Sequence, residues 1–493
     1  MTITDALIWL PVAGALAVWL LPLPREGSLG LAFLVALAEV GLWISALLRF
    51  DFGDSGLQLS TNASWISDLN VSYTVGLYGF SLWLVGLAVV VCAAATGYAL
   101  LAGRDRARAY GGLMLFLTGA IVGVFCSQDL LLFYAFFEAM LIPLYVLIGA
   151  WGGPGRLGAT VKFVIYTMAG SLLMLAAVVA FGISQNTFSL LDSGTSTNDW
   201  LFLAFVIAFA VKAPIFPFHG WLTDAYRESP PEISAILSGV VSKAAVFGFI
   251  RIAIAKFPEP ADRFTVPILV FAAISLAYGS LLAFRAPDFR GVMAYSSMAQ
   301  MGLITLGLFA FNDLGLDGAV LQSVNHGLIS GSMFLVAGMI ERRTSTGDFS
   351  LLGGMARGRP ALATVLMTTG IIALAVPGSG AFAGEFLILS GVFTQGWGYA
   401  VVGAVAMVLA AMYVLRLISA VLHRSRGPAV SDAALDLRVG ELGIVVPLVA
   451  LLLALSAWPN AVSGHSFSGA PIGWTGYGPP ASALDATFKA NSP

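Results

Sequence analysis

Five ionisable side chains stand in stretches of the sequence that are otherwise apolar. Glu138 lies in LLLFYAFFEAMLIPLYVLI, Lys212 in LFLAFVIAFAVKAPIFPFHGW, Lys243 in GVVSKAAVFGF, His326 in SVNHGLISGS and Glu385 in GAFAGEFLIL. Carboxyl, amine and imidazole groups within an apolar environment form the proton relays of membrane pumps. The pattern therefore indicates a row of groups that hand protons to one another.

Most of these side chains also have a purely structural interpretation. Lys212 could end a membrane helix and reach the headgroups, and Glu138 could be a protonated carboxyl bonded to a neighbour. His326 could be a core histidine, and Glu385 could be a hydrogen-bonding residue that packs at a helix break. Lys243 has no such explanation, because AAVFGFI follows it. A charge at the bilayer centre costs about 2.5–3.5 kcal/mol, so these groups are expected to face one another, or water.

Two helix breaks are expected beside these groups. KAPIFPF places two prolines just after Lys212, and VPGSGAFAGEF places three glycines just before Glu385. A proline removes a backbone donor and frees carbonyl groups, which water can then hydrate. A lysine beside a hydrated break can exchange its proton, so we interpret Lys212 as a proton-carrying group. If Glu138 lies near Lys212 and the distance between them can change, the pair would act as a proton switch.

The elements that must position these groups are membrane helices. The chain has 493 residues, of which 58% are hydrophobic and only 10% charged, and its mean hydropathy is +0.90. Soluble domains carry roughly 25% charged residues, so the fold class is an all-α polytopic membrane protein. A net charge of -2 indicates no nucleic-acid partner. Cys92 and Cys126 lie in apolar runs and are interpreted as core residues, so neither a metal site nor a redox cofactor is expected on this chain.

About fourteen transmembrane helices are expected, because a hydrocarbon core takes roughly 20 helical residues. The expected spans are 5–23, 29–49, 76–101, 109–126, 129–150, 160–182, 200–218, 232–254, 264–284, 289–310, 317–340, 361–393, 397–422 and 440–462.

The distribution of positive charge predicts the orientation of these spans. Arg25, the first positive charge, comes after the first apolar run, which indicates a retained helix with its N-terminus outside. With that orientation 17 of the 24 lysines and arginines fall in inside loops and 5 in outside segments. Both termini are then periplasmic in a bacterial inner membrane, and loop 50–75 and tail 463–493 lie outside.

The two broken spans predict an internal symmetry. The broken span of Glu385 comes five helices after that of Lys212, and this odd offset means that the two run in opposite directions. Paired interrupted helices of opposite direction are typical of inverted repeats. We therefore expect two inverted five-helix repeats containing broken helices. The expected units are 1–107 with helices 1–3, 108–256 with helices 4–8, 257–423 with helices 9–13, and 424–493 with the last helix and an outside tail.

Four long motifs resemble a known family. SQDLLLFYAFFEAMLIPLYVLIG, KAPIFPFHGWLTDAYRESPPEISAILSGVVSK, FRGVMAYSSMAQMG and SGAFAGEFLIL look like the antiporter-like subunits of respiratory complex I, a proton-translocating NADH:quinone oxidoreductase. Related subunits occur in Mrp-type cation/proton antiporters and in membrane-bound hydrogenases. Most relatives carry lysine where this chain has Glu385, and glutamate there is typical of the M-type (chain 4) branch.

The resemblance implies a role for each ionisable group. Glu138 and Lys212 would form the charge-switching pair of one half-channel. Lys243 would be the connecting lysine, His326 a relay on the central axis, and Glu385 the exchange group towards the periplasm.

Secondary site residues are also implied. Asp129 matches a motif acid at the outer end of helix 5, and His219 stands in the HGWL motif. Tyr295 and Ser296 match the AYSS motif beside a helix break. Gln300 stands where that motif usually has histidine, and an amide can hold a water wire but cannot titrate.

The resemblance further implies partners and cofactors. NADH, FMN, iron–sulfur clusters and quinone would belong to other subunits, and the partners would be membrane-arm subunits that include homologous antiporter-like subunits. The chain departs from the family at Thr223 and Tyr226, where proline and histidine are usual. The alternatives are a subunit of an Mrp-type Na+/H+ antiporter or membrane-bound hydrogenase, a structural subunit that has lost pumping, and a solitary transporter.

Overall fold

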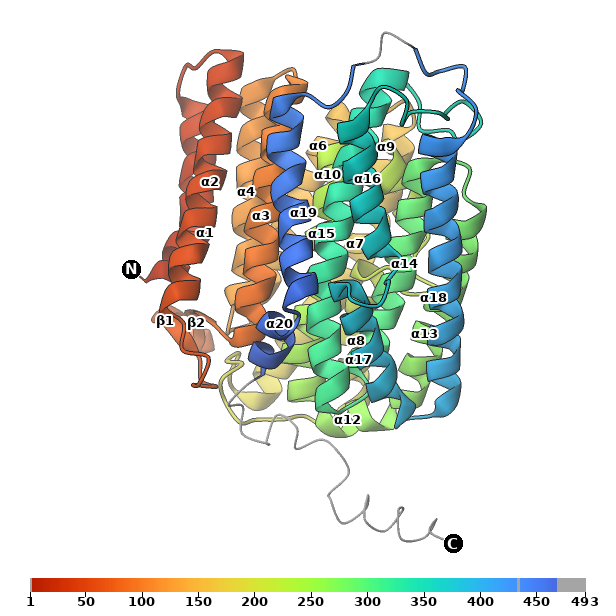
Figure 1. The fold of residues 1–493 in the computed structure, drawn as a ribbon. Helices are drawn as coiled ribbons and strands as arrows, with labels where there is room; N and C mark the ends of the chain where they lie inside the picture. The colour runs from red at the N-terminus through yellow and green to blue at the C-terminus, as the bar shows by residue number, and fades with distance from the viewer. Residues whose placement is uncertain (1, 432–434, 468–493) are drawn as a thin grey trace, which may run out of the picture.

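The computed structural model describes residues 2–431 and 435–467. Long helices run up and down beside one another, with the chain crossing from one end of the bundle to the other at each turn (Figure 1). Eleven helices in the described residues are long and apolar enough to cross a membrane. The expected fold class, an all-α polytopic membrane protein, is therefore confirmed.

The first three helices and a hairpin come before the motif-bearing part. Thr2 and Asp5 cap the first helix reciprocally, since each side chain accepts a hydrogen bond from the other residue's backbone N–H. The elements are α1 (Ile3–Leu20), α2 (Arg25–Arg49), β1 (Gln58–Ile66), the short helix η1 (Ser67–Leu69), β2 (Val71–Leu77) and α3 (Gly79–Ala102).

The next elements carry Glu138, Lys212 and Lys243. They are α4 (Ala107–Cys126), α5 (Leu130–Ala139), α6 (Leu141–Trp151), α7 (Arg156–Gln185), α8 (Asp199–Lys212), α9 (Leu222–Glu228), α10 (Pro231–Ile236), the π-helical η2 (Leu237–Val241), α11 (Lys243–Gly248) and the π-helical η3 (Phe249–Ile254).

The remaining elements carry Gln300, His326 and Glu385. They are α12 (Pro258–Arg263), α13 (Thr265–Arg285), α14 (Phe289–Leu308), α15 (Asp313–Thr344), α16 (Pro360–Ala373), α17 (Gly380–Phe393), α18 (Trp397–Ile418), the π-helical η4 (Ser419–His423), α19 (Val439–Ala457) and α20 (Asn460–Ser466).

Both expected helix breaks are present. Helix α8 ends at Lys212, and the chain stays irregular until α9 begins at Leu222. The span expected at 361–393 divides into α16 and α17, with Ala375 and Gly378 at positive φ between them. In Figure 1 the chain runs along α8 towards the end of the bundle where α9 lies. It runs along α16 and α17 in the opposite direction, away from that end.

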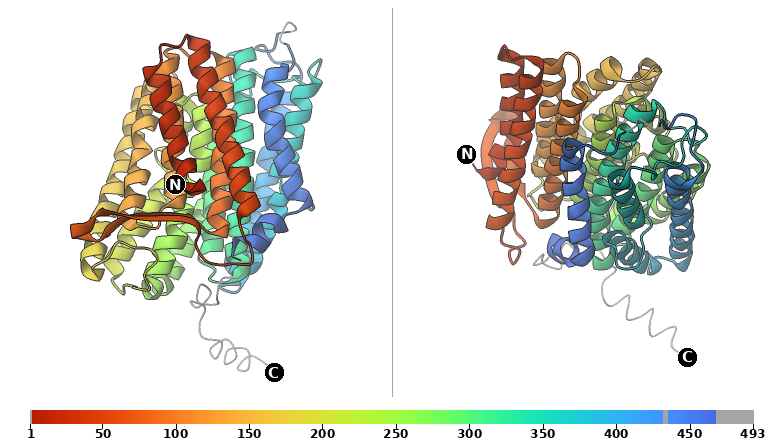
Figure 2. Two further views of the ribbon diagram at one scale, coloured as in Figure 1. Left: turned by 90° about the vertical axis from the view of Figure 1, so that its left-hand side faces the viewer. Right: turned by 45° about the horizontal axis from the view of Figure 1, so that its top comes forward.

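The hairpin is the main departure from the expected helices. The span expected from residue 76 begins at Gly79, because Val71–Leu77 pairs antiparallel with Gln58–Ile66. The hairpin lies across the bundle near the lower ends of the helices (Figure 2). Its turn reaches the end of α7, where the Asn70 side chain donates to the carbonyl of Asn186. Alternating serine, threonine and asparagine in this stretch are typical of a half-exposed strand. A search for apolar segments of membrane-helix length does not detect such a strand.

Two smaller expectations are also corrected, and a third lies mostly outside the described residues. Helix α14, which carries the AYSS motif, runs unbroken, and the nearby irregular backbone is instead the π-helical η2. The last span divides into α19 and α20, because Pro459 interrupts it. Of the expected outside tail 463–493, only residues 463–467 fall within the described part of the chain.

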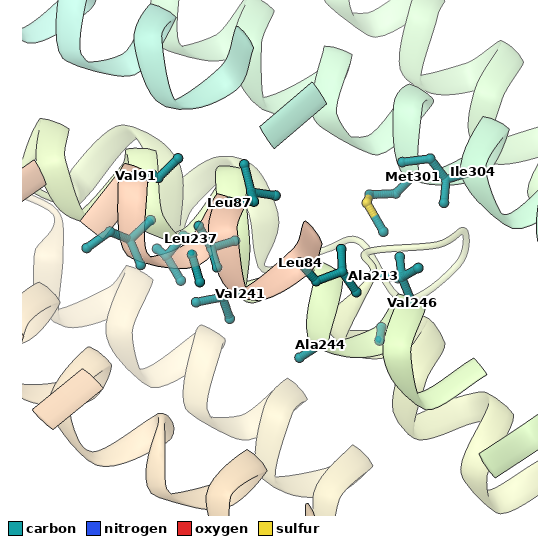
Figure 3. Close-up of a cluster of buried hydrophobic side chains, with 14 of the residues drawn as sticks. Leu84, Leu87, Val91, Ala213, Leu237, Val241, Ala244, Val246, Met301 and Ile304 are labelled. Carbon is teal, nitrogen blue, oxygen red and sulfur yellow. The ribbon is translucent and has the colours of Figure 1, made fainter. Parts of the chain in front are cut away.

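The most buried helices form the axis of the bundle. The segment Pro231–Ile254 and helix α15 are fully buried over the windows that would cross a membrane. Apolar side chains from α3, η2, α11 and α14 pack together around this axis (Figure 3). Leu87, Leu237 and Met301 are among them, and each is almost completely buried. Polar groups on these helices are therefore shielded from lipid by protein.

Candidate functional site

Glu138 lies at a discontinuity in its span. Helix α5 ends at Ala139 and α6 begins at Leu141, because Pro143 has no N–H to donate to the carbonyl of Ala139. Pro143 is visible in the sequence and was a signal for this break. The Glu138 side chain is half-buried, so it reaches the outer surface of the bundle and is more accessible than the other four groups.

Lys212 is buried at the end of α8. Its side chain is 3% exposed, and Nζ lies 4.8 Å from the centre of the Phe137 ring, one residue before Glu138. Lys212 and Glu138 therefore lie in the same region of the bundle. The two nevertheless form none of the ion pairs within 4.0 Å found in the described residues. The structure thus brings them near one another without direct contact.

The backbone break after Lys212 is partly satisfied by side chains. Trp221 donates its indole N–H to the carbonyl of Val211 at 3.0 Å, and the N–H of Phe216 donates to Oγ of Ser275 at 2.6 Å. A freed carbonyl or N–H group buried without a partner is costly. These contacts hold the break in one conformation beside the amine of Lys212.

Lys243 and His326 are in direct contact. Nζ of Lys243 lies 2.7 Å from Nδ1 of His326, and it also donates to the carbonyl of Ser238 at 2.8 Å. Lys243 is 0% and His326 4% exposed. The irregular η2 lies just before Lys243, and Val241 is its last residue. A π-helical turn shifts the direction of the following side chains, which is why such turns are frequent at functional sites.

A chain of hydroxyl groups lies beside this pair. Ser238 on η2 donates to Oγ of Ser297 on α14 at 3.1 Å, and it also contacts the hydroxyl of Ser330 on α15. All three side chains are completely buried. Hydroxyl groups both donate and accept, so the three helices are joined at a point where a proton can be passed on.

Glu385 is held by two amide side chains. Gln300 donates from Nε2 to Oε1 of Glu385 at 2.9 Å, and Gln322 donates to the same oxygen at 3.4 Å. Gln322 also donates to Oε1 of Gln300 at 2.8 Å. Glu385 is 2% exposed, and its Oε2 has no hydrogen-bond partner among the residues that the structure describes. Gln300, which replaces the usual histidine, thus contacts the carboxylate directly.

Asp129 has a structural part in the fold. It is the N-cap of α5, where Oδ1 accepts from the backbone N–H groups of Leu131 and Leu132 at 2.9 and 3.1 Å. Its Oδ2 accepts from the N–H of Ser72 in β2 at 3.2 Å. This carboxylate therefore starts the helix that carries Glu138 and also attaches the hairpin to it.

The other secondary residues lie apart from the two buried clusters. The His219 ring stacks on Phe216 with centroids 5.7 Å apart, and its buried Nδ1 has no hydrogen-bond partner within the described part of the chain. The hydroxyl groups of Ser296 and Tyr413 lie 2.9 Å apart, which joins α14 to α18. Tyr295, next to Ser296, is half-buried.

Sequence reasoning missed four polar residues of the buried axis. They are Ser238, Gln322, Asn325 and Ser330. A signal was available in α15, which is the least apolar of the eleven candidate spans and yet entirely buried. Gln322 precedes His326 by one helical turn, and Ser330 follows it by one turn, so all three point to one side of the helix.

Metal-ligating side chains are scattered in this structure. No group of three or more His, Cys, Asp or Glu residues that could hold a metal ion occurs in residues 2–431 and 435–467. The buried groups that do cluster are an amine with an imidazole, and a carboxylate with two amides. What such groups can do chemically is bind, hold and transfer protons.

Comparison with known proteins gives one consistent family. The family model described as NADH:quinone oxidoreductase/Mrp antiporter, TM, matches residues 127–411. NADH-quinone oxidoreductase subunit M of Rickettsia prowazekii is 31% identical over 469 residues, covering 92% of this chain and 95% of the relative. The subunit M of Rhodobacter capsulatus is 35% identical over 437 residues, covering 85% of this chain and 84% of the relative.

Solved structures agree with the sequence relatives. A chain of respiratory complex I from Thermus thermophilus with bound NADH superimposes with a TM-score of 0.88 at 29% identity, covering 96% of this chain and 99% of that one. A chain of the Mrp complex from Dietzia superimposes with a TM-score of 0.86 at 20% identity, covering 97% of this chain and 99% of that one. At that lower identity the second likeness concerns the fold.

Proposed function

The chain belongs to the NADH:quinone oxidoreductase/Mrp antiporter transmembrane family, and from this premise we propose that it translocates protons in the membrane arm of an NADH:quinone oxidoreductase. It is a multi-pass membrane subunit of the M type, and the enzyme to which it contributes is a translocase. The observation that carries the proposal is the set of ionisable groups at helix breaks, next to the π-helical η2 and on the buried helix α15. Two of these groups, Lys243 and His326, are in direct contact.

The proposed transfer step uses the contact between Lys243 and His326. A proton on Nζ passes to Nδ1 across 2.7 Å, which leaves a neutral amine and an imidazolium ring. The ring then releases the proton from Nε2, and the imidazole is again neutral. The neutral amine keeps a hydrogen bond with Oγ of Ser242 at 3.3 Å. The transfer from Lys243 to His326 thus uses two groups already within hydrogen-bond distance.

Glu138 and Lys212 form the proposed charge switch. Because no direct ion pair joins them in this structure, the lysine is free to exchange its proton with a neighbour. If Glu138 and Lys212 moved together, the carboxylate would keep Lys212 protonated. If they moved apart, Lys212 would release its proton. The irregular segment 213–221 follows Lys212 directly, so movement of this lysine would not have to shift a continuous helix. Glu385 is the proposed exchange group towards the outside.

The membrane orientation is also proposed. Relatives of this chain in Rickettsia and Rhodobacter are bacterial proteins, and 17 of the 24 positive charges fall in loops on one side. Positive loops face the cytoplasm, so we place the protein in a bacterial inner membrane with both termini periplasmic. The proposed repeats are residues 108–256 and 257–423, and the two helix breaks of opposite direction support them.

Partners and cofactors follow from the same premise. The partners are the other membrane-arm subunits, which include homologous antiporter-like subunits. NADH, FMN, iron–sulfur clusters and quinone are proposed to bind to other subunits, where they supply the electron transfer that drives the pump. The residues of this chain bind, orient and transfer protons.

The function is tested by Glu138→Gln and Lys212→Ala in the native membrane. NADH:quinone reduction and the accompanying proton uptake are measured on the same inverted vesicles, and NADH:ferricyanide activity reports assembly. Loss of both coupled rates, with ferricyanide activity retained, is expected. If both variants keep both rates, the chain is not part of the pump. Unchanged NADH chemistry with loss of sodium-driven proton movement would instead assign the chain to an Mrp-type antiporter.

A further inference from the structure

Glu39 is a sixth ionisable group within an apolar stretch, and it stands apart from the five groups described above. It lies in the middle of α2 and is 0% exposed. Within residues 2–431 and 435–467, no donor reaches either oxygen of its carboxyl group. The match to the family begins at residue 127, so Glu39 belongs to none of the family motifs. A buried polar group without a partner requires an explanation of its own.

The packing of α2 on α4 determines what Glu39 faces. In Figure 1, α1, α2 and α4 stand side by side at one edge of the bundle. A Cβ placed on Gly111 of α4 would lie 3.3 Å from Cβ of Ala32 on α2. These two helices run in the same direction, and seven residues are close to two helical turns. Glu39 follows Ala32 by seven residues and Thr118 follows Gly111 by seven, so Glu39 faces Thr118.

Helix α1 completes this interface at the same depth. A Cβ placed on Gly119 of α4 would lie 3.3 Å from the ring of Pro11, and one placed on Gly14 would lie 2.7 Å from Val35 of α2. Helices α1 and α2 run in opposite directions. One turn after Val35 on α2 therefore lies level with one turn before Gly14 on α1, which places Glu39 level with Pro11.

Pro11 leaves an acceptor without its donor at this level. A proline has no N–H, so the carbonyl group of Leu7 lacks its helical hydrogen bond. A helical carbonyl points towards the residue four positions later, so the Leu7 carbonyl lies on the face of α1 that carries Pro11. Glu39 thus stands opposite an oxygen that needs a donor.

The donors nearest to Glu39 are already used. The hydroxyl of Thr118 donates to the carbonyl of Met114 at 2.9 Å. The indole N–H of Trp43, one turn after Glu39, donates to the carbonyl of Leu82 at 3.0 Å. The interface consequently offers acceptors to the carboxyl group and no free donor, which is the environment of a protonated acid.

No positive charge compensates an ionised Glu39. It takes part in none of the ion pairs found in the part of the chain that the structure describes. The lysines and arginines within α1 to α4 are confined to the helix ends, at Arg25, Arg49 and Arg108. An unpaired charge at the centre of a bilayer is strongly unfavourable, so the neutral form of Glu39 is favoured.

We propose that Glu39 keeps a bound proton, and that the neutral acid donates it to the Leu7 carbonyl that Pro11 leaves free. A protonated carboxyl group has one O–H to donate, which an ionised carboxylate lacks. The bond joins α1 to α2 in the middle of the membrane. Glu39 is thus a proton-holding group that forms no part of the proton path and does not release its proton during turnover.

Glu39→Gln and Glu39→Leu separate the hydrogen bond from the charge. Glutamine is neutral and keeps a donor, so thermal inactivation of the assembled complex should remain close to that of the unmodified complex. Leucine has no donor and should shorten the inactivation half-time severalfold. In inverted vesicles, the glutamine variant should retain NADH:quinone reduction and proton uptake. A glutamine variant that inactivates as fast as the leucine variant overturns the proposal, and so does an assembled one with reduced proton uptake.

Pro11→Ala identifies the acceptor. It supplies a backbone N–H that bonds the Leu7 carbonyl within α1, so Glu39→Leu should shorten the half-time much less in this background. Pro447→Ala is the matched control, because Pro447 also lies inside a membrane helix, α19, and its effect should simply add to that of Glu39→Leu. An equal effect of Glu39→Leu with and without Pro11 overturns the proposal.

An infrared difference spectrum gives a result that needs no destabilised variant. The spectrum of the unmodified complex minus that of Glu39→Gln should contain the C=O band of a protonated carboxyl group. A carboxylate band in its place would show that Glu39 is ionised, and the proposal would then be wrong.

Discussion

At the scale of single residues, the sequence indicated which ionisable groups lie among apolar helices, and their role in carrying protons stays a prediction. A glutamate, two lysines and a histidine in apolar runs lie on buried helices, and the histidine meets Lys243. The partners of these groups were less predictable. Asn325 and Gln322 are neutral amides that a search for titratable residues passes over. Their importance depends on which helix faces α15, and this is decided by tertiary packing.

His326→Gln separates relay from packing. A glutamine keeps an acceptor for the amine of Lys243 but cannot titrate, so proton uptake should be lost while the complex remains stable. His326→Leu removes the acceptor as well. We expect it to lower stability by roughly 1.5–3 kcal/mol, the range for a hydrogen bond to a charged group. Proton uptake and thermal inactivation of the purified complex measure the two effects. Full pumping by the glutamine variant would remove His326 from the path.

Asp129 gives the opposite prediction, because its bonds are structural. Asparagine caps helices nearly as well as aspartate, so Asp129→Asn should retain quinone reductase activity and proton uptake. Asp129→Ala should cost about 0.5–2 kcal/mol, the range for loss of an N-cap, and should also release the hairpin at Ser72. Thermal inactivation compares the two variants. Loss of pumping in a stable asparagine variant would instead show that the carboxyl carries protons.

At the scale of elements, hydropathy and glycine–proline patterns placed the helices and both breaks, but not the hairpin or the π-helical turns. The hairpin depends on the pairing of β1 with β2 and on the hydrogen bond from Asn70 to the carbonyl of Asn186 at the end of α7. The π-helical η2 depends on its packing between α3 and α15. Such features arise from neighbours that are distant in the sequence, and local composition does not encode them.

Gly378 tests whether the break in α16–α17 depends on backbone conformation alone. It has φ +98, and a Cβ there would meet nothing within 4 Å. Gly378→Ala should therefore destabilise by roughly 1–2 kcal/mol through strain without a clash. Gly41→Ala is the control, since Gly41 is also in open space but within helix α2. It should stabilise by roughly 0.5–1 kcal/mol. Equal thermal inactivation of the two variants would contradict this interpretation.

Asp436 links two elements in a pH-dependent way. Its carboxylate accepts from the backbone N–H groups of Ala361 and Leu362 at the start of α16, both at 2.9 Å, and of Leu437 at 2.7 Å. Burial raises the pKa of Asp436, but these bonds and nearby Arg343 outweigh it and lower the pKa below its usual value. The stabilisation is present above the unfolded-state pKa of roughly 4 and is lost as pH falls through the lower folded value.

Asp436→Asn should consequently destabilise at pH 7 and matter less in acid, where the aspartate is itself protonated. Limited proteolysis of the loop before α19, followed from pH 7 downwards, measures the difference. Asp105→Asn is a suitable control, because the Asp105 side chain is 70% exposed. A constant difference between Asp436→Asn and the unmodified protein at all pH values would exclude the carboxylate as the cause.

At the scale of the whole molecule, the first three helices are joined to the motif-bearing part by a buried charge cluster. Glu232 at the start of α10 is 0% exposed. It accepts from Nε of Arg104 at 2.6 Å, from Nη2 of Arg104 at 2.7 Å and from the hydroxyl of Tyr110 at 2.6 Å. The match to the family begins at residue 127, after Arg104. Nothing in the family motifs therefore pointed to Arg104 as the partner of Glu232. The cluster fixes the relative position of two parts that the repeat boundaries would separate.

Glu232→Leu should be strongly destabilising, because it leaves the Arg104 charge unpaired. We expect a loss of about 3 kcal/mol, the lower end for breaking a buried pair, since the Arg104 side chain remains 22% exposed. Combining Glu232→Leu with Arg104→Leu should recover most of that loss. Thermal inactivation of the three variants forms a double-mutant cycle. If the double variant is no more stable than Glu232→Leu, the charge left behind is not the cause.

The wholly buried α15 has a consequence for how the chain enters the membrane. It is the least apolar of the eleven candidate spans, and it brings Gln322, Asn325 and His326 with it. Polar residues at the centre of a span oppose transfer from the translocon into lipid. During synthesis, α15 therefore enters the bilayer most easily against helices that are already inserted, above all α14 and α10, which pack on it. The polar residues that belong to the proposed proton path thus also make insertion of α15 depend on the order in which its neighbouring helices enter the membrane.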